Sequence, residues 1–170
     1  MDPRERIGRP VETISTPALV VDAEALEHNL RTMAAYFSAR PAKLRPHIKS
    51  HKCATLARRQ LAAGGAVGIT CAKLSEAEAL AGNGIEDILI ANQVVGAEKA
   101  ARLAALNRRA VVRCAVDCPA NVADLGAAAV AAGVVVPVLI EVDIGMRRCG
   151  VPPGDEALAL ARTIARTPGL

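Results

Sequence analysis

The basic segment over residues 44–52, Leu-Arg-Pro-His-Ile-Lys-Ser-His-Lys, contains the residue types best suited to chemistry in this chain. If the segment is a strand, its period of two places Arg45, His47 and Lys49 on one face and apolar residues on the other. Because burial of unpaired charge is costly, this face indicates an anionic ligand or a reactive carbonyl group. Neighbouring cations and partial burial favour a neutral lysine amine, which can form a Schiff base with a carbonyl. The alternatives are structural binding of an anion and a solvated loop.

Two histidines, His47 and His51, flank Lys49 in this segment. One interpretation is that either ring orients the lysine or a bound phosphate. The other is that both are polar residues lining the wet end of a sheet. Their two-residue spacing would also suit a pair of metal ligands.

A second polar constellation, Glu-Val-Asp-Ile-Gly-Met-Arg-Arg-Cys-Gly, occupies residues 141–150. Period two places Glu141 and Asp143 together on one face at the end of an apolar run, where a barrel enzyme builds its site. The alternative is that the two carboxylates form structural ion pairs with Arg113 or Arg148.

Three weaker candidates lie at the ends of other apolar runs. Asn92 and Gln93 follow the strand expected over 87–91, a suitable place for a site, although amides are common in loops. Asp117 ends the next strand, and we expect it to cap the helix that follows. The thiols of Cys71 and Cys149 are expected to be buried and structural.

These residues must be positioned by alternating strands and helices. Apolar runs predict strands over 43–50, 67–71, 87–91, 110–117 and 134–143. Helical spacing predicts helices over 23–39, 53–63, about 75–82, 97–107, 120–132 and 156–166, with a Ser75-x-x-Glu78 capping box and an Asp155 cap. Strands separated by single helices indicate a parallel sheet, either doubly wound or part of a (β/α)₈ barrel. The lack of a G-x-G-x-x-G sequence favours an incomplete barrel of about five of the eight strands.

The chain divides into three parts by this interpretation. Residues 1–15 form a polar arm, and 16–42 form a short strand, ending at the helix cap Asp22, and its helix. Residues 43–170 form the incomplete barrel. Because the chain ends where a further strand is expected, the sequence predicts a fragment of a longer protein.

Composition narrows the class of protein. The 170 residues are 52% hydrophobic and 22% charged, as in soluble globular domains. The net charge of +4 is scattered and aromatic content is 1%, so nucleic-acid binding is not expected. No apolar run approaches the roughly 18 residues of a membrane span. Five cysteines without a C-x-x-C pair fit a reducing cytoplasm.

Three segments together resemble the fold-type III pyridoxal-phosphate enzymes, which share the barrel of the alanine racemase N-terminal domain. They are Thr-Pro-Ala-Leu-Val-Val-Asp at 16–22, Arg-Pro-His-Ile-Lys-Ser-His-Lys at 45–52 and Cys-Ala-Lys-Leu-Ser-Glu-Ala-Glu at 71–78. Within that group the chain most resembles the D-threonine aldolase and D-3-hydroxyaspartate aldolase branch, to which D-serine dehydratase is related. The segment 45–52 is the most specific part of the resemblance. The resemblance also implies a separate C-terminal β domain, which we expect to be absent from this chain.

The resemblance implies specific roles for residues of this chain. Lys49 corresponds to the lysine that holds pyridoxal phosphate covalently at the carboxyl end of the first barrel strand. Arg148 corresponds to the arginine of the family's E-I/V-D-x-G-x-x-R-C-G segment, which approaches the cofactor's phenolic oxygen, and Arg147 is expected to face solvent. The further candidate cofactor-binding residues are His47, His51, Arg45 and Asn92.

The function implied is retro-aldol cleavage of a small D-3-hydroxy amino acid by the full-length protein, as a homodimer. A divalent cation is expected, with its ligands outside this chain, so we predict no metal ligands here. The alternatives are D-serine dehydratase or amino-acid racemase activity, a non-catalytic pyridoxal-phosphate protein, and a barrel that binds an anion without a cofactor.

Overall fold

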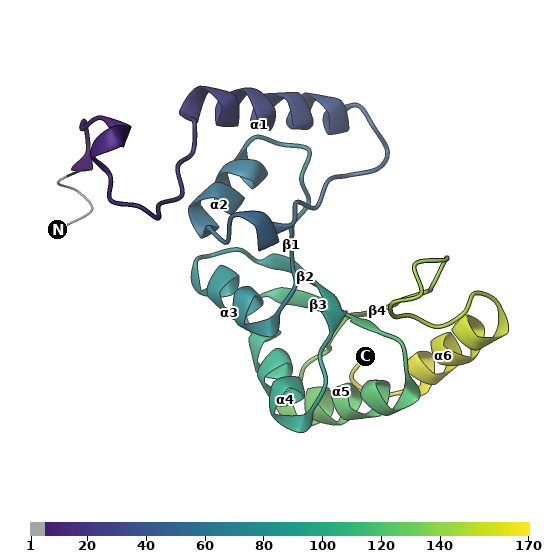
Figure 1. Ribbon diagram of the computed structural model, residues 1–170. Coiled ribbons are helices and arrows are strands. Elements are labelled where there is room, and N and C mark those ends of the chain that lie inside the picture. The colour runs from purple at the N-terminus through teal and green to yellow at the C-terminus, as the bar shows by residue number, and fades with distance from the viewer. Residues whose placement is uncertain (1–5) are drawn as a thin grey trace.

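A parallel sheet forms the centre of the protein, whose residues 6–170 are described by a computed structural model. Its four strands are β1 (Ile69–Cys71), β2 (Asp87–Gln93), β3 (Val111–Val116) and β4 (Val138–Ile140), and they are hydrogen-bonded in the order β1-β2-β3-β4. Sequential order without a reversal is that of a barrel and not of a doubly wound sheet. The sheet is open (Figure 1), which confirms the prediction of an α/β partial barrel.

The first predicted strand is only partly formed. Leu44 and His47 make isolated parallel bridges to Ala66 and Thr70, which adds this segment beside β1. After His47 the chain turns into a short 3-10 helix, η3 (Ile48–Ser50). The prediction of a strand as far as residue 50 is therefore wrong. The cause is local, because the Nδ1 atom of His47 accepts a hydrogen bond from the backbone N–H of Lys49 (3.1 Å).

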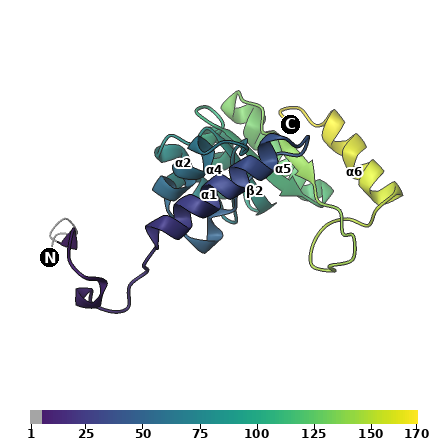
Figure 2. The same ribbon diagram turned by 90° about the horizontal axis from the view of Figure 1, so that it is seen from above.

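The N-terminal part contains η2 (Val11–Thr13) and α1 (Ala23–Ser38). Asp22 caps α1 as predicted, its carboxylate accepting the N–H of Ala25 at 2.8 Å. The strand predicted at 16–22 is not present, and Leu19 is 95% exposed. A strand requires a neighbour for its backbone groups, and in Figures 1 and 2 this segment runs away from the sheet.

The other helices confirm the helical spacing. They are α2 (Ala54–Ala62), α3 (Leu74–Gly82), α4 (Ala97–Leu106), α5 (Pro119–Ala132) and α6 (Asp155–Arg166). Two predicted caps are wrong. Glu76, not a Ser75–Glu78 pair, caps α3, because its carboxylate accepts the N–H groups of Ala72 and Lys73. Asp155 is the first helical residue, preceded by Gly154.

The two faces of the sheet differ in character. One face packs against α3 and α4, and its centre is buried, with Ile69, Cys71, Ile88, Ile90, Val112, Cys114 and Val116 removed from solvent. The opposite face is the barrel interior and carries polar groups at both ends of the strands. This division follows from the alternation of side chains along each strand.

An ionic cluster occupies the interior face at the amino ends of the strands. Asp87, the first residue of β2, accepts a hydrogen bond from Arg45 (2.8 Å) and pairs with Arg113 of β3. Burial opposes ionisation of Asp87, but the hydrogen bonds and charges of Arg45 and Arg113 hold its pKa below the ordinary 3.8. The cluster thus ties β2 and β3 to the 44–47 segment.

Replacement of Asp87 by Asn should lower the free energy of unfolding by about 1–2 kcal/mol, because it leaves two arginines without their anion in a half-buried site. Since the folded-state pKa of Asp87 is lowered, its contribution is present above 3.8 and is lost as the pH falls through the folded-state value. Urea unfolding at neutral pH and at lower pH measures both effects. The matched control Glu98→Gln removes the exposed pair with Arg102 and should leave the free energy of unfolding almost unchanged.

Candidate active site

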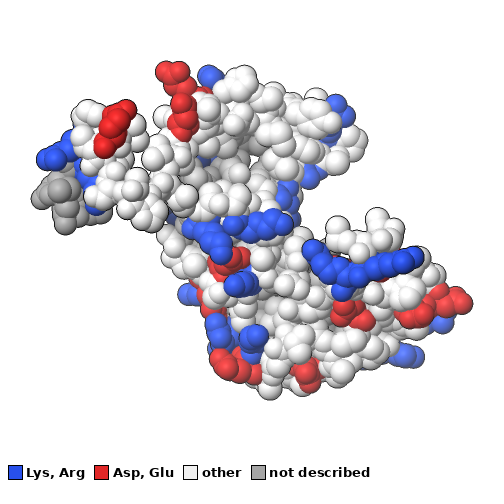
Figure 3. Space-filling model, viewed as in Figure 1, with Lys and Arg blue, Asp and Glu red and all other residues white. Residues whose placement is uncertain are grey.

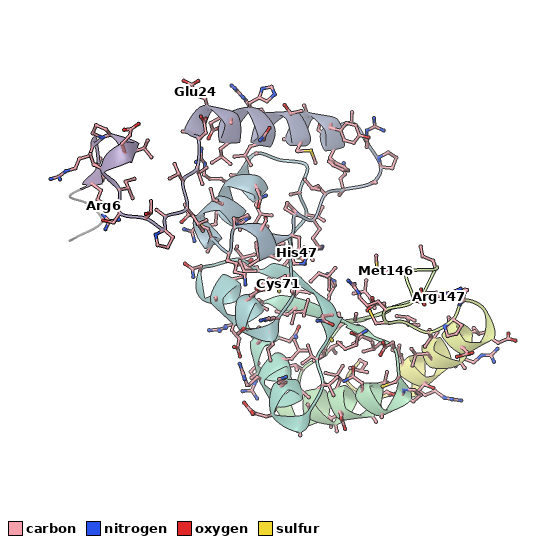
Figure 4. All side chains as sticks on the ribbon, in the orientation of Figure 1. Arg6, Glu24, His47, Cys71, Met146 and Arg147 are labelled. Atoms are coloured by element: carbon pink, nitrogen blue, oxygen red, sulfur yellow. The ribbon has the colours of Figure 1, made fainter. Side chains whose placement is uncertain are left out.

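The carboxyl ends of the strands open into a notch. Figure 3 shows a hollow between the α1–α2 part of the molecule and the loop over 143–150, with Lys and Arg side chains on both sides. In Figure 4, His47 lies on one side of the notch and Met146 and Arg147 of the loop lie on the other. Parallel strands bring residues distant in sequence to this one edge.

The turn that carries Lys49 is organised by its two histidines. His47 Nδ1 accepts the N–H of Lys49, and His51 Nδ1 accepts the N–H of Cys53, both at 3.1 Å. Each neutral ring must therefore carry its hydrogen on Nε2. His51 Nε2 is buried and has no hydrogen-bond partner among residues 6–170. An orphaned buried donor beside an exposed lysine fits a ligand that supplies an acceptor, such as a phosphorylated cofactor.

The charge state of His47 is set by its surroundings. Partial burial lowers the pKa of His47 below 6.5, the positive charge of Lys49 lowers it further, and Glu76 opposes both. His47 is therefore a neutral hydrogen-bond donor through Nε2 at neutral pH. Burial also opposes ionisation of Glu76, but the bonds from Ala72, Lys52 and Lys73 leave its pKa lowered overall.

A polar network joins the carboxyl ends of three strands. The Nε2 atom of Gln93, the last residue of β2, donates to Asp117 Oδ2 (2.9 Å) after β3 and to Glu141 Oε2 (2.8 Å) after β4. The prediction that Asp117 caps α5 is wrong, because Cys118 occupies the cap position. In the sequence, these three polar residues stand at the ends of successive apolar runs, which indicates a shared edge of the sheet. Their contact with one another could not be predicted from that pattern.

The loop over 143–150 is held by carboxylates at both ends. Asp143 Oδ1 accepts the N–H groups of Gly145 (2.9 Å) and Arg147 (3.0 Å), and these backbone bonds lower the pKa of Asp143. The alternative of ion pairs with Arg113 or Arg148 is wrong for both acids. Asp143 binds backbone N–H groups, Glu141 binds Gln93 and Cys149, and Arg113 pairs with Asp87.

The predicted site residues fall into separate places. His47, Lys49 and His51 lie on one turn, and the exposed Arg148 lies in the loop across the notch. Arg45 is at the amino ends of the strands, bonded to Asp87.

Asn92 lies on the outer side of the strand ends. Its Nδ2 atom makes a long 3.5 Å contact with Ala72 O. It lines a cavity of about 360 Å³ between the first turns of α3 and α4, together with Lys73 and Lys99. Among the described residues, Asn92 makes no hydrogen bond to the turn that carries Lys49.

Among residues 6–170, no group of three His, Cys, Asp or Glu side chains is arranged to hold a metal ion. No helix in this range is both long and apolar enough to cross a membrane.

The fold and the notch define a class: a parallel α/β chain that forms part of a barrel and presents a lysine just after the 44–47 segment that pairs with the chain beside β1. Residues 21–170 match the family described as "Alanine racemase, N-terminal domain". The chain belongs to this family, for which pyridoxal phosphate is the expected cofactor.

Similar proteins of known activity are aldolases and a dehydratase. The chain is 44% identical to D-threonine aldolase of Arthrobacter sp. over 170 residues, 100% of this chain and 45% of the relative. It is 40% identical to 3-hydroxy-D-aspartate aldolase of Paracoccus denitrificans (strain Pd 1222) over 164 residues, 96% of this chain and 42% of the relative. The chain thus spans less than half the length of these relatives.

Solved structures agree with the fold. D-threonine aldolase from Filomicrobium marinum superimposes with a TM-score of 0.89 at 47% identity, covering 92% of this chain and 42% of that one. D-threo-3-hydroxyaspartate dehydratase from Delftia sp. HT23 gives 0.82 at 34% identity, covering 93% and 42%. The resemblance to the aldolase branch is therefore confirmed.

Replacement of Lys49 by Ala should raise the pKa of His47, because the charge of Lys49 is one cause of its lowering; burial should still keep it below 6.5. Nuclear magnetic resonance titration of the His47 ring protons in the cofactor-free protein measures this. Since the folded-state pKa of His47 is lowered, its contribution to stability is present above pH 6.5 and is lost as the pH falls from 6.5 through the folded-state pKa. In the control Lys99→Ala the His47 titration should not move; a shift there, or none in Lys49→Ala, would contradict the assignment.

Proposed function

We propose that the protein containing this chain is a pyridoxal-phosphate-dependent lyase that cleaves a small D-3-hydroxy amino acid by a retro-aldol reaction. The observation that carries the proposal is the turn over residues 47–51. It presents the exposed Lys49 between two histidines, and His51 offers a buried Nε2 donor without a partner. The aldolases similar to this chain support the choice of reaction.

We assign the residues the following roles. Lys49 attaches the cofactor, and its amine is steered by the turn that His47 closes. The Nε2–H groups of His47 and His51 donate hydrogen bonds to an acceptor of the cofactor, such as a phosphate or ring oxygen. Arg148, from across the notch, supplies positive charge to the cofactor's phenolic oxygen. Pyridoxal phosphate, when bound, supplies an electron sink for the pair of electrons released by bond cleavage.

Two of the predicted residues receive indirect roles. Arg45 is engaged with Asp87, so we assign it to holding the segment that leads to Lys49 rather than to cofactor contact. Asn92 accepts the N–H of Gln93 (3.0 Å) and contacts Ala72 O, so we assign it to fixing the end of β2.

The remaining parts of the proposal concern the whole protein. We propose that the ligands of a divalent cation lie outside residues 6–170 and that the full-length enzyme is a homodimer. We also propose that residues 16–42, which contain α1, and residues 43–170, which contain the incomplete barrel, are separate parts of the chain. The arm expected over 1–15 includes residues 1–5, which lie outside the described residues. All five cysteines are free thiols, which supports a reducing cytoplasmic setting.

A second candidate is elimination of water from the same class of substrate. The similarity to the Delftia dehydratase favours it, since the same barrel supports both reactions. Racemisation is a third possibility on this scaffold. Incubation of the full-length protein with D-threonine and with D-3-hydroxyaspartate separates the three. Glycine with an aldehyde indicates the aldolase, and a keto acid with ammonia indicates the dehydratase. The Cα epimer, which is L-allo-threonine when the substrate is D-threonine, indicates the racemase.

Reduction of the cofactor-loaded full-length protein with borohydride should attach pyridoxal phosphate to Lys49, because reduction makes the lysine bond permanent. Peptide mass spectrometry locates the modified residue. The variant Lys49→Ala should lose the visible absorption band of the lysine-bound cofactor. Its cleavage rate should fall at least about 1,000-fold, because a covalent catalyst has been removed.

The matched control for this experiment is Lys99→Ala, an exposed lysine in the first turn of α4, which should keep both the band and the rate. Attachment of the cofactor to any other lysine, or an unmodified wild-type protein, would contradict the proposed function.

A further inference from the structure

We propose that Gln93 is a positioning residue whose side-chain amide fixes, through Asp117 and Glu141, the loop that carries Arg148. The inference rests on the proposed function only for what Arg148 does to the cofactor. The anchoring of the loop stands on the geometry of the strand ends.

Gln93 reaches this position because of an irregularity in the sheet. Ile90 pairs with Cys114, but the next register partner of β3, Ala115, pairs with Gln93. The bulge brings Gln93 level with Ala115, two residues before Asp117. Bulges commonly re-aim a side chain next to an active site.

The amide of Gln93 is fully used by two carboxylates. Its Nε2 atom has two hydrogens, and it donates to Asp117 Oδ2 at 2.9 Å and to Glu141 Oε2 at 2.8 Å. Two carboxylates that approach one atom this closely repel each other. The amide between them offsets the repulsion with a donor for each.

Both carboxylates also bind the end of the loop. Asp117 Oδ2 accepts the backbone N–H of Gly150 at 3.1 Å, and Glu141 Oε1 lies 2.9 Å from Cys149 Sγ, whose thiol donates to it. Each acid therefore connects Gln93 to one of the two residues that follow Arg148.

The start of the loop is anchored separately by Asp143, which binds the N–H of Arg147. Arg148 is thus fixed on both sides, although its own side chain is exposed. Without the Gln93 amide, the two acids would move apart and release the Cys149–Gly150 anchor. The position of Arg148 would then be set from the Arg147 side and by the backbone bonds of Val151 to Glu141 and Asp143, without the side-chain anchor at Cys149 and Gly150.

The test uses the variant Gln93→Met, which keeps the length of the side chain but removes its donors, in the full-length protein. Hydrogen exchange of the cofactor-free protein should show the Gly150 amide exchanging at least about fivefold faster, since a bond to a fixed carboxylate is lost. In the cofactor-loaded protein, the visible absorption of the cofactor is titrated with pH, and the pH at which the change is half complete should shift in the same direction as in Arg148→Ala. In the double variant the shift should be no larger than in Arg148→Ala alone.

Two further comparisons keep the test decisive. Cys149→Ser retains a donor to Glu141 and should behave as wild type, whereas Cys149→Ala should reproduce part of the Gln93→Met shift; this pair decides the matter if Gln93→Met does not fold. Arg102→Gln, which removes a polar contact between α3 and α4 away from the notch, should change neither readout.

Unchanged exchange at Gly150 overturns the inference. A Gln93→Met shift that persists in full beside Arg148→Ala also overturns it, because Gln93 would then act by another route. A wild-type protein without any cofactor band overturns the proposed function, and with it the role toward the cofactor. A normal wild-type band with an unmoved midpoint in Gln93→Met overturns this inference alone.

Discussion

The burial of one face of the sheet is the constraint on which the rest of the structure depends. Ile88 and Ile90 of β2 must face the helices, because only burial there removes their side chains from water. The residues between and beyond them are consequently turned to the barrel interior. Asp87 and Gln93 lie at the two ends of that interior face. The packing of one face thus places an ion cluster at one end of the sheet and an amide–carboxylate network at the other.

Local periodicity explains how much of the fold could be predicted. The helix α1 follows from its apolar spacing and from Asp22, whose carboxylate needs only the N–H three residues away. Prediction failed where a side chain had two possible partners. His47 binds the backbone of its own turn and ends the strand, and Glu78 binds Arg102 of the next helix instead of capping α3. A sequence shows both options but not which partner is near.

The residue types of the candidate site could be read from the sequence, but their arrangement in space could not. Lys49 stood out because a basic segment interrupted an apolar pattern, and its motif resembled that of a known family. The contact of Arg45 with Asp87 spans 42 positions in the sequence. The contact of Gln93 with Glu141 spans 48, and it depends on a bulge that no residue pattern in β2 announces. Such contacts are determined by register, which only the assembled sheet supplies.

The charges around the notch follow from how its acids are used. Asp117, Glu141 and Asp143 accept hydrogen bonds from an amide, a thiol and backbone N–H groups, all of them neutral donors. Glu76 differs, since it pairs with Lys52. Within residues 6–170, neither Lys49 nor Arg148 has an acidic partner among the ion pairs of the structure. The acids therefore hold the loop in place without forming ion pairs with these two cations, which leaves positive charge on both sides of the notch.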